Sequence, residues 1–275
     1  SEIKFSFKNK TDSGLTVQMV QELQSDDGDT AIDEGSMSIS GGFGKITLGG
    51  QDGPSDSGFG IAANNLVSEE MYPVSGANAS SGFTHDLGIK NGDMNNLSGD
   101  ANKITYETPS MSGLTAAISY ADSGEVGSSD TTQVAAKYSM DAGGAKVTLG
   151  VVSGTTENTT QDIDSSVVGV QIDSGNMSVI LSQSEYEANG DDEQGVDFGI
   201  SYKVSDDLKL VGYTTEVEDD STSEEYSNTG VEAVYTIASG LSAILTVEDY
   251  DYKVGSATGN NDSGTESKLT IKAKF

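Results

Sequence analysis

The chain has 275 residues, of which 34% are hydrophobic, and 14 lysines against 44 acidic residues give it a formal net charge of −30. This charge argues against nucleic-acid binding, which depends on neutralising phosphates with lysine and arginine, and it favours cations as partners. The absence of cysteine excludes disulfides and thiol chemistry. Low hydrophobicity with high charge would suggest disorder, but the apolar residues recur at every second position in many short blocks, which indicates strands.

These blocks predict about fifteen strands and no convincing helix. The first block shows the pattern, because Ile3, Phe5 and Phe7 alternate with polar residues that include Lys4 and Lys8. In chain order, the apolar positions of the blocks lie within 3–7, 15–19, 37–39, 46–48, 104–106, 114–120, 134–140, 147–151, 168–172, 177–181, 196–202, 208–210, 231–237, 241–247 and 269–275.

The connections between the blocks alternate between short and long. Seven are tight turns, at TDSG, GGFG, PSMSG, DAGG, DSGN, SDD and SG, and the other seven are long and acidic, such as ANGDDEQG and VEDDSTSEEYSN. On antiparallel strands this rhythm puts all tight turns at one end and all long loops at the other. Together with apolar-out, polar-in strands it indicates an all-β fold, a transmembrane antiparallel β-barrel of the outer-membrane type.

Two soluble alternatives fit the sequence less well. A β-sandwich needs large residues, often including tryptophan, for its core, whereas this chain has no Trp and its apolar positions carry many Val, Ala, Leu and Ile. Fifteen strands would also need two sandwiches, and no linker divides the chain. A secreted β-roll would show the GGxGxDxUx repeat, which is absent. The barrel is therefore the favoured interpretation, as a single domain over residues 1–275.

Three segments carry a resemblance to a known family. The chain ends in the strand LTIKAKF, closed by Phe275; residues 8–23 read KNKTDSGLTVQMVQEL; and residues 35–54 read GSMSISGGFGKITLGGQDGP, followed by the longest loop of the chain. In these features the sequence resembles the general porins of Gram-negative outer membranes, of the sixteen-stranded trimeric type. Because both termini of a porin lie on one side, the resemblance implies sixteen strands, the first of them missing before residue 1; a barrel closed by an odd number of strands is the alternative.

The resemblance implies a bacterial outer-membrane protein that forms a homotrimer in lipid and admits small hydrophilic solutes by passive diffusion. It implies that Phe275 is read by the barrel-assembly machinery. It also implies that the third extracellular loop, residues 51–102, folds into the lumen and narrows the pore; a disordered surface loop is the alternative. The acidic residues of this loop are Asp52, Asp56, Glu69, Glu70, Asp86, Asp93 and Asp100.

If the apolar residues of each strand face lipid, the lysines that alternate with them face the lumen. Porins have a wall of basic residues in the lumen, opposite the acidic loop. The residues proposed for this wall are Lys4, Lys8, Lys45, Lys103, Lys268 and Lys272. Family members usually build the wall from arginine, which this chain lacks, so we expect a weaker transverse field and a pore that prefers cations.

Other chemistry is expected to be limited. The acidic stretches SDDGD and NGDDE are candidates for Ca²⁺ or Mg²⁺, but no EF-hand pattern is present and no cofactor is expected. One His, no Cys and no GxSxG motif leave no catalytic triad, so no enzyme is expected. Two other functions stay open. One is a substrate-selective porin with a lumen binding site, for which Tyr213 and Tyr250 are candidates, and the other is a structural or adhesion barrel.

Overall fold

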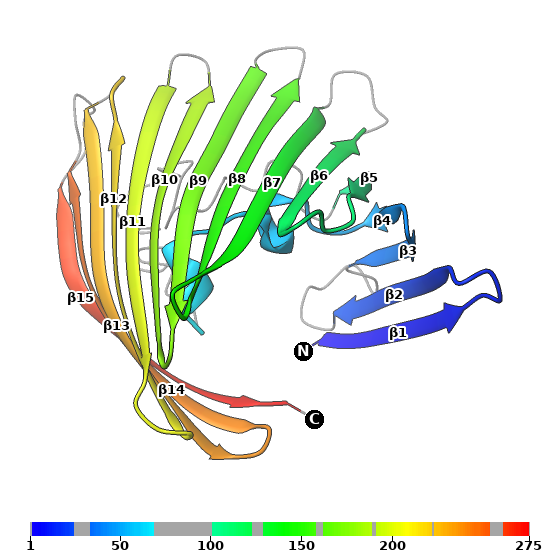
Figure 1. The fold of residues 1–275 in the computed structure, drawn as a ribbon. Coiled ribbons are helices and arrows are strands. Elements are labelled where there is room, and N and C mark those ends of the chain that lie inside the picture. The colour runs from blue at the N-terminus through cyan, green and yellow to red at the C-terminus, as the bar shows by residue number, and fades with distance from the viewer. Residues whose placement is uncertain are drawn as a thin grey trace. The chain divides into compact units, whose positions relative to one another are not determined.

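The computed structural model describes residues 2–24, 34–68, 101–122, 129–157, 162–188, 191–221, 223–253 and 261–274. Within these ranges it contains one fifteen-stranded sheet, in which the strands follow one another in chain order, and two short helical segments (Figure 1). The all-β fold and the strand number predicted from the sequence are confirmed. The sixteenth strand, expected before residue 1, stays a prediction.

The strands are short near the N-terminus and longer from β7 onward. Their bounds are β1 Glu2–Lys10, β2 Thr16–Gln24, β3 Gly35–Gly41, β4 Gly44–Gly50, β5 Asn102–Glu107, β6 Leu114–Ala121, β7 Asp130–Ala142, β8 Ala145–Glu157, β9 Asp162–Ser174, β10 Met177–Ala188, β11 Asp191–Lys203, β12 Leu208–Asp219, β13 Glu224–Ala238, β14 Leu241–Lys253 and β15 Asp262–Ala273. The helical segments are η1 Ser55–Phe59 and η2 Ala63–Leu66. None of the helices in the described ranges has the length and apolar character needed to cross a membrane.

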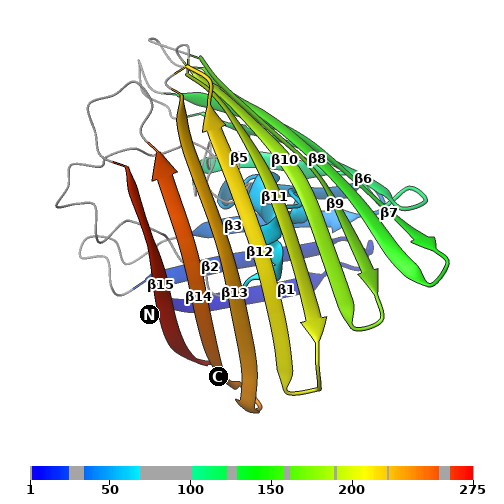
Figure 2. The same ribbon diagram turned by 90° about the vertical axis from the view of Figure 1, so that its left-hand side faces the viewer.

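The chain divides into two compact units. The first unit comprises residues 1–60, 96–138 and 150–166, and the second comprises 61–95, 139–149 and 167–275. In the first unit β1 to β7 pair as successive antiparallel neighbours. In the second unit β10 to β15 do the same, and Figure 2 shows the strands from β11 to β15 running side by side.

Strand pairing sorts the side chains of each unit onto two faces of opposite character. On the apolar face of the second unit Ala233, Leu245 and Leu269 lie side by side in register, and the two leucines are 48% and 69% exposed. On the other face, Asp197 and Thr215 are paired in register and buried. We call these the apolar face and the polar face. A soluble sandwich buries its apolar side chains, so exposed apolar and buried polar positions match a sheet whose apolar face meets lipid.

The first unit shows the same two faces. On its apolar face Met37 lies opposite Leu48, and Leu48 opposite Ile104, all well exposed. On its polar face Thr47 and Thr105 are paired and buried. The alternation predicted from the sequence is therefore confirmed in both units.

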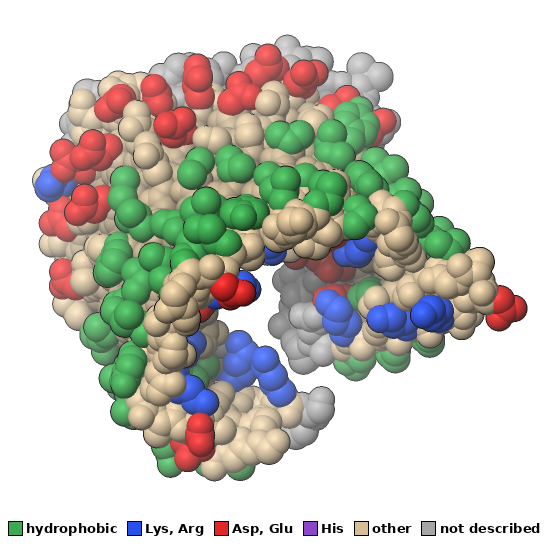
Figure 3. Space-filling model, viewed as in Figure 1, with side chains coloured by type: hydrophobic (Ala, Val, Ile, Leu, Met, Phe, Trp, Pro, Cys, Tyr) green, Lys and Arg blue, Asp and Glu red, His purple; other side chains and the backbone are tan. Residues whose placement is uncertain are grey.

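The acidic stretches at the loop ends of the strands differ from the prediction. The sequence predicts long loops at ANGDDEQG and VEDDSTSEEYSN, but β11 begins at Asp191 and β13 at Glu224, so both stretches lie largely in paired strands. Both faces of these strand ends carry polar residues. The sequence therefore does not alternate between apolar and polar residues there, although the strands remain paired. Figure 3 shows the acidic side chains gathered toward the loop ends of the strands and the hydrophobic ones nearer the turns.

The tight turns fall where the sequence places them. The turn between β7 and β8 consists of Gly143 and Gly144, with φ angles of 62° and 94°. Two successive positive φ values match the type I′ geometry that suits the twist of a hairpin, and only glycine adopts them without steric cost. The turn thus explains the glycine pair in DAGG.

A lysine scan across the apolar face tests which part of it contacts lipid. Leu245→Lys lies within the apolar part of β14, so we expect it to cost about 2–4 kcal/mol of unfolding free energy in phospholipid vesicles. Thr229→Lys lies on the same face of β13, opposite Asp249, and is expected to cost no more than about 1 kcal/mol because it lies near the interface. Urea unfolding of the refolded variants measures both values, and equal costs would contradict the placement of Leu245 in lipid and of Thr229 near the interface.

Candidate functional site

Residues 51–68, which follow β4 and form the described part of the predicted loop 51–102, lie against the polar face; we call them the inner segment. In the first unit, the Gln51 side-chain amide donates to Thr105 Oγ1 on β5 at 3.3 Å. The side-chain oxygen of Gln133 on β7 accepts hydrogen bonds from both the backbone N–H and the hydroxyl of Ser55, each at 3.3 Å. The start of the inner segment is thus held by polar-face side chains.

Lys137 on β7 binds the helical turn that follows. Its Nζ donates to the Gly58 carbonyl at 2.7 Å and lies 5.2 Å from the centre of the Phe59 ring. Gly58 has a φ of 89°, a left-handed conformation that glycine adopts readily. The lysine combines a charged hydrogen bond with a cation–π contact, and the buried Phe59 is fixed beneath it.

In the second unit the inner segment packs through apolar side chains. Ile61, Ala63 and Leu66 form a buried cluster with Ile180 on β10 and with Val211. The turn η2 contacts β10, β11 and β12. The contact buries apolar side chains of the inner segment and of the strands together, so this part of the polar face serves as the docking surface of the segment.

The inner segment ends in a cluster of charged side chains around Ser68. Lys209 on β12 donates from Nζ to the Leu66 carbonyl and to the Ser68 hydroxyl, both at 3.0 Å. The Ser68 backbone N–H donates to both carboxylate oxygens of Glu232 on β13, at 3.0 and 3.1 Å. Lys272 on β15 donates to the Ser68 carbonyl at 3.4 Å. We call Lys209, Glu232 and Lys272 the Ser68 clamp.

Further polar side chains on this face bind one another between strands. The Tyr213 hydroxyl donates to Glu248 Oε2 at 2.7 Å, and the Asn228 side-chain amide donates to Glu248 Oε1 at 3.2 Å. Asp197 accepts from the Thr215 hydroxyl at 2.6 Å. These networks satisfy carboxylates that would otherwise be costly to bury.

Of the acidic loop residues predicted from the sequence, Asp52 and Asp56 lie on the inner segment, and both are exposed. Asp56 accepts a hydrogen bond from the Ser55 hydroxyl at 3.0 Å. The other five, Glu69, Glu70, Asp86, Asp93 and Asp100, lie outside the described residues, as does Phe275.

The six lysines predicted to form a basic wall all lie on strands at polar-face positions. Several have acidic or backbone partners: Lys4 forms an ion pair with Glu22, and Lys45 pairs with Glu107 at 2.7 Å. Lys272 belongs to the Ser68 clamp. Lys103 is buried, whereas Lys8 and Lys268 are exposed. Their role in selectivity stays a prediction.

Sequence reasoning missed Lys209, Glu232 and the apolar docking surface. A signal was present, because Ile180 and Val211 each stand beside an apolar neighbour in VILS and LVG, where strict alternation calls for a polar residue. Such consecutive apolar pairs mark positions where both faces of a strand are covered.

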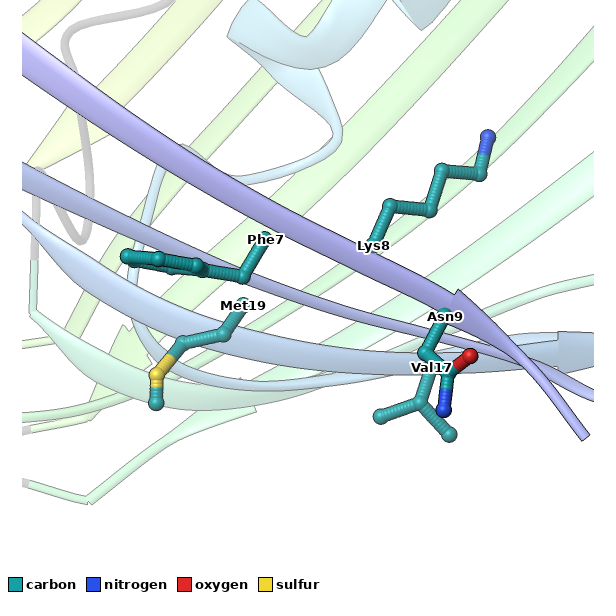
Figure 4. Close-up of a pocket in the computed structure, with 5 residues that line it drawn as sticks. All are labelled: Phe7, Lys8, Asn9, Val17 and Met19. Carbon is teal, nitrogen blue, oxygen red and sulfur yellow. The ribbon is translucent and has the colours of Figure 1, made fainter.

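A groove of about 450 Å³ on β1 and β2 is not a candidate for solute binding. Figure 4 shows Phe7, Val17 and Met19 on one side of the strands and Lys8 on the other. The first three belong to the apolar face, where a membrane protein meets lipid. Among the described residues, no group of three or more acidic, His or Cys side chains is placed to hold a metal ion. The expectation for Ca²⁺ or Mg²⁺ at acidic loops stays a prediction.

Several solved structures described as porins or outer-membrane proteins are similar to this one. The anion-selective porin from Comamonas acidovorans matches with a TM-score of 0.71 at 16% identity, over 100% of this chain and 89% of that chain. The outer-membrane expressed OmpT of Vibrio cholerae matches with a TM-score of 0.69 at 14% identity, over 99% and 88%. A mutant of the Rh. blastica porin matches with a TM-score of 0.65 at 20% identity, over 100% and 89%.

A search of curated proteins by sequence finds no match. The family model described as Gram-negative porin matches residues 1–255. The match covers most of the chain, and it agrees with the two-faced antiparallel sheet and with the porin folds of the similar structures. The chain therefore belongs to the Gram-negative porin family and is a protein of the bacterial outer membrane.

Proposed function

We propose that this porin is a passive diffusion channel for small hydrophilic solutes and ions, and that residues 51–102 narrow its lumen. The observation that carries the proposal is the docking of the inner segment on the polar face. A loop that extends into solvent would not form hydrogen bonds with the side chains of many strands. Residues 51–68 form such bonds with side chains of β5, β7, β12, β13 and β15. The polar face of a porin lines its aqueous lumen.

We further propose a preference for cations. The chain carries a net charge of −30, and Asp52 and Asp56 lie exposed on the inner segment. Two lysines of the polar face, Lys4 and Lys45, each form an ion pair with a glutamate on the neighbouring strand. The similar porin from Comamonas acidovorans is described as anion-selective, but at 16% identity the likeness concerns the fold and does not transfer selectivity.

The polar face supports a substrate-selective channel less well. Its described part carries five tyrosines, Tyr186, Tyr213, Tyr226, Tyr250 and Tyr252, with Tyr226 and Tyr252 directly opposite each other. All but the partly exposed Tyr186 are at most 8% exposed, whereas a solute that binds along aromatic rings needs their faces open. We propose no catalytic step and no cofactor. We propose that the porin assembles as a homotrimer, by analogy with a similar structure that is described as a trimer form of Vibrio cholerae OmpT.

Conductance in a planar bilayer tests the channel directly. We expect the purified protein to give ohmic single-channel steps that no small sugar blocks saturably, because the proposed pore has no solute site. Saturable block would instead support the substrate-selective alternative, and the absence of any conductance from correctly folded protein would contradict the channel.

Reversal potentials in a KCl gradient test the cation preference. We expect a potential of the sign set by K⁺, and a smaller one in the Asp52→Asn, Asp56→Asn double variant, since two negative charges leave the inner segment. The Asp206→Asn, Asp207→Asn double variant is the matched control, because both are exposed residues in the turn between β11 and β12. A reversal potential of the sign set by chloride in the unmodified protein would contradict the preference for cations. Equal effects of the control and of the Asp52→Asn, Asp56→Asn variant would show that the charges of the inner segment do not set this preference.

A further inference from the structure

The charges on the polar face of the second unit change sign along the strands. We call the end with the connections from β9 to β10, β11 to β12 and β13 to β14 the turn side, and the opposite end the loop side. β15 shows the change within a single strand. From the loop side to the turn side, its polar-face positions carry Asp262, Glu266, Lys268 and Lys272, and Lys274 follows its last residue. All five side chains are at least partly exposed.

Neighbouring strands carry the same charges in rows across the polar face. Near the loop side Glu193 on β11 lies opposite Asp219 on β12, which lies opposite Glu224 on β13. Near the turn side Lys203 on β11 lies opposite Lys209 on β12. Like charges directly opposite each other destabilise the pairing of strands, so strand pairing gives no reason for these rows.

The apolar face of the second unit is also acidic at the loop side. Its exposed carboxylates there include Glu185, Glu187, Asp192, Glu218, Asp249 and Asp251. Among the described lysines of this unit, Lys253 alone lies near the loop side, and it pairs with Glu225 at 2.6 Å. Asp206 and Asp207 offset part of the lysine charge at the turn side, so the loop side is the more strongly charged end.

The first unit has the same polarity. β1 ends with Lys8 and Lys10, both exposed, beside the tight turn to β2. At the opposite strand ends, the exposed residues Glu157 and Asp162 flank the connection between β8 and β9. Each unit by itself thus gathers lysines toward one end of its strands and carboxylates toward the other.

A wall charge that differs between the two ends changes the number of ions in a water-filled channel when the voltage reverses. A wall of one sign raises the local concentration of ions of the opposite sign. When the voltage drives cations from the loop side to the turn side, cations enter through the acidic end and anions through the basic end, so both accumulate. When the voltage is reversed, each ion enters through the end that repels it, so the lumen loses ions and conducts less.

We propose that this channel rectifies, because it conducts better when the voltage drives cations from the loop side to the turn side than in the opposite direction. The order of the charges along the polar face sets the preferred direction. This inference rests on the proposed channel. It goes beyond the preference for cations, which depends on the total charge and not on the order of charges along the strands.

Screening by salt gives the proposal a measurable signature. The Debye length is about 10 Å in 0.1 M salt and about 3 Å in 1 M salt, so the wall charges act across a lumen only in dilute salt. At equal and opposite voltages in 0.1 M KCl, we expect the single-channel conductance to be about twofold larger in the preferred direction. In 1 M KCl we expect the two conductances to be nearly equal, so that the channel gives ohmic steps.

The direction of rectification is assigned with a label on the turn side. The chain has no cysteine, and Ser239 is exposed in the turn between β13 and β14. A bulky maleimide-linked polymer added to one chamber should therefore lower the conductance of the Ser239→Cys variant only when the turn side faces that chamber. Each recorded channel can in this way be oriented without altering a charge.

An exchange of charges along β15 tests the origin of the rectification. The exchange variant combines Asp262→Lys and Glu266→Lys with Lys268→Glu and Lys274→Glu, which reverses the order of these charges and leaves the net charge unchanged. We expect its ratio of conductances in 0.1 M KCl to fall toward one or to invert. The Asp262→Asn, Glu266→Gln variant removes only the loop-side charges of β15, and we expect an intermediate ratio.

The matched control removes charges without changing the balance between the two ends. Glu225→Gln with Lys253→Gln deletes an ion pair at the loop side, so the net charge of that end stays the same. We expect the ratio of conductances to stay that of the unmodified protein. The steps themselves show that each variant is folded and inserted.

The outcomes separate rectification from the channel itself. A larger conductance in the predicted direction in dilute salt, reduced in both β15 variants and unchanged in the control, supports the proposal. Steps of equal size in both directions in 0.1 M KCl, or rectification in the opposite direction, would overturn it while the channel stands. A ratio that the β15 variants change no more than the control would also overturn it, and the absence of steps from folded protein would overturn both the channel and its rectification.

Discussion

Lipid offers no hydrogen-bond partner to a polypeptide backbone, and this constraint determines the rest of the structure. Each strand must satisfy its N–H and C=O groups on its neighbours, so the chain forms antiparallel pairs in sequence order. Once the pairs are in register, side chains sort by parity. Leucine, isoleucine and phenylalanine stand exposed on one face, and threonine, glutamate and asparagine lie buried on the other. The arrangement is the reverse of a soluble domain.

The polar face must then satisfy many buried charges and hydroxyls without a conventional core. It does so in part through bonds between strands, such as Tyr213 to Glu248 and Thr215 to Asp197, and in part by binding a segment of its own chain. The inner segment gives backbone partners to Lys137, Lys209 and Glu232. Lysines that the sequence suggests as selectivity residues thus share the face with lysines that hold backbone, and parity alone does not distinguish the two roles.

Parity explains both the success and the failure of prediction from the sequence. The apolar halves of the strands were predictable, because Leu241, Ala243 and Leu245 alternate with smaller or polar neighbours on one lipid-facing side. The loop-side halves of the strands were not predictable. In Glu224–Asn228 both faces carry polar residues, so the paired strand does not show as an alternation of apolar and polar residues in the sequence. The docking of the inner segment was predictable only in part. The consecutive apolar pairs at Ile180 and Val211 indicate covered positions, whereas the close approach of Gly169 and Gly199 to the segment is visible only in the fold.

The central claim is that one face of the sheet meets lipid and the other lines water. Single cysteines at Ser267, Lys268, Leu269, Thr270 and Ile271 on β15, each carrying a nitroxide, test it in reconstituted vesicles. We predict that accessibility to oxygen, which partitions into lipid, is high at 269 and 271, and that accessibility to a water-soluble nickel complex is high at 268 and 270. A profile without this period of two, or one with the two reagents exchanged, would contradict the assignment of the faces and with it the channel.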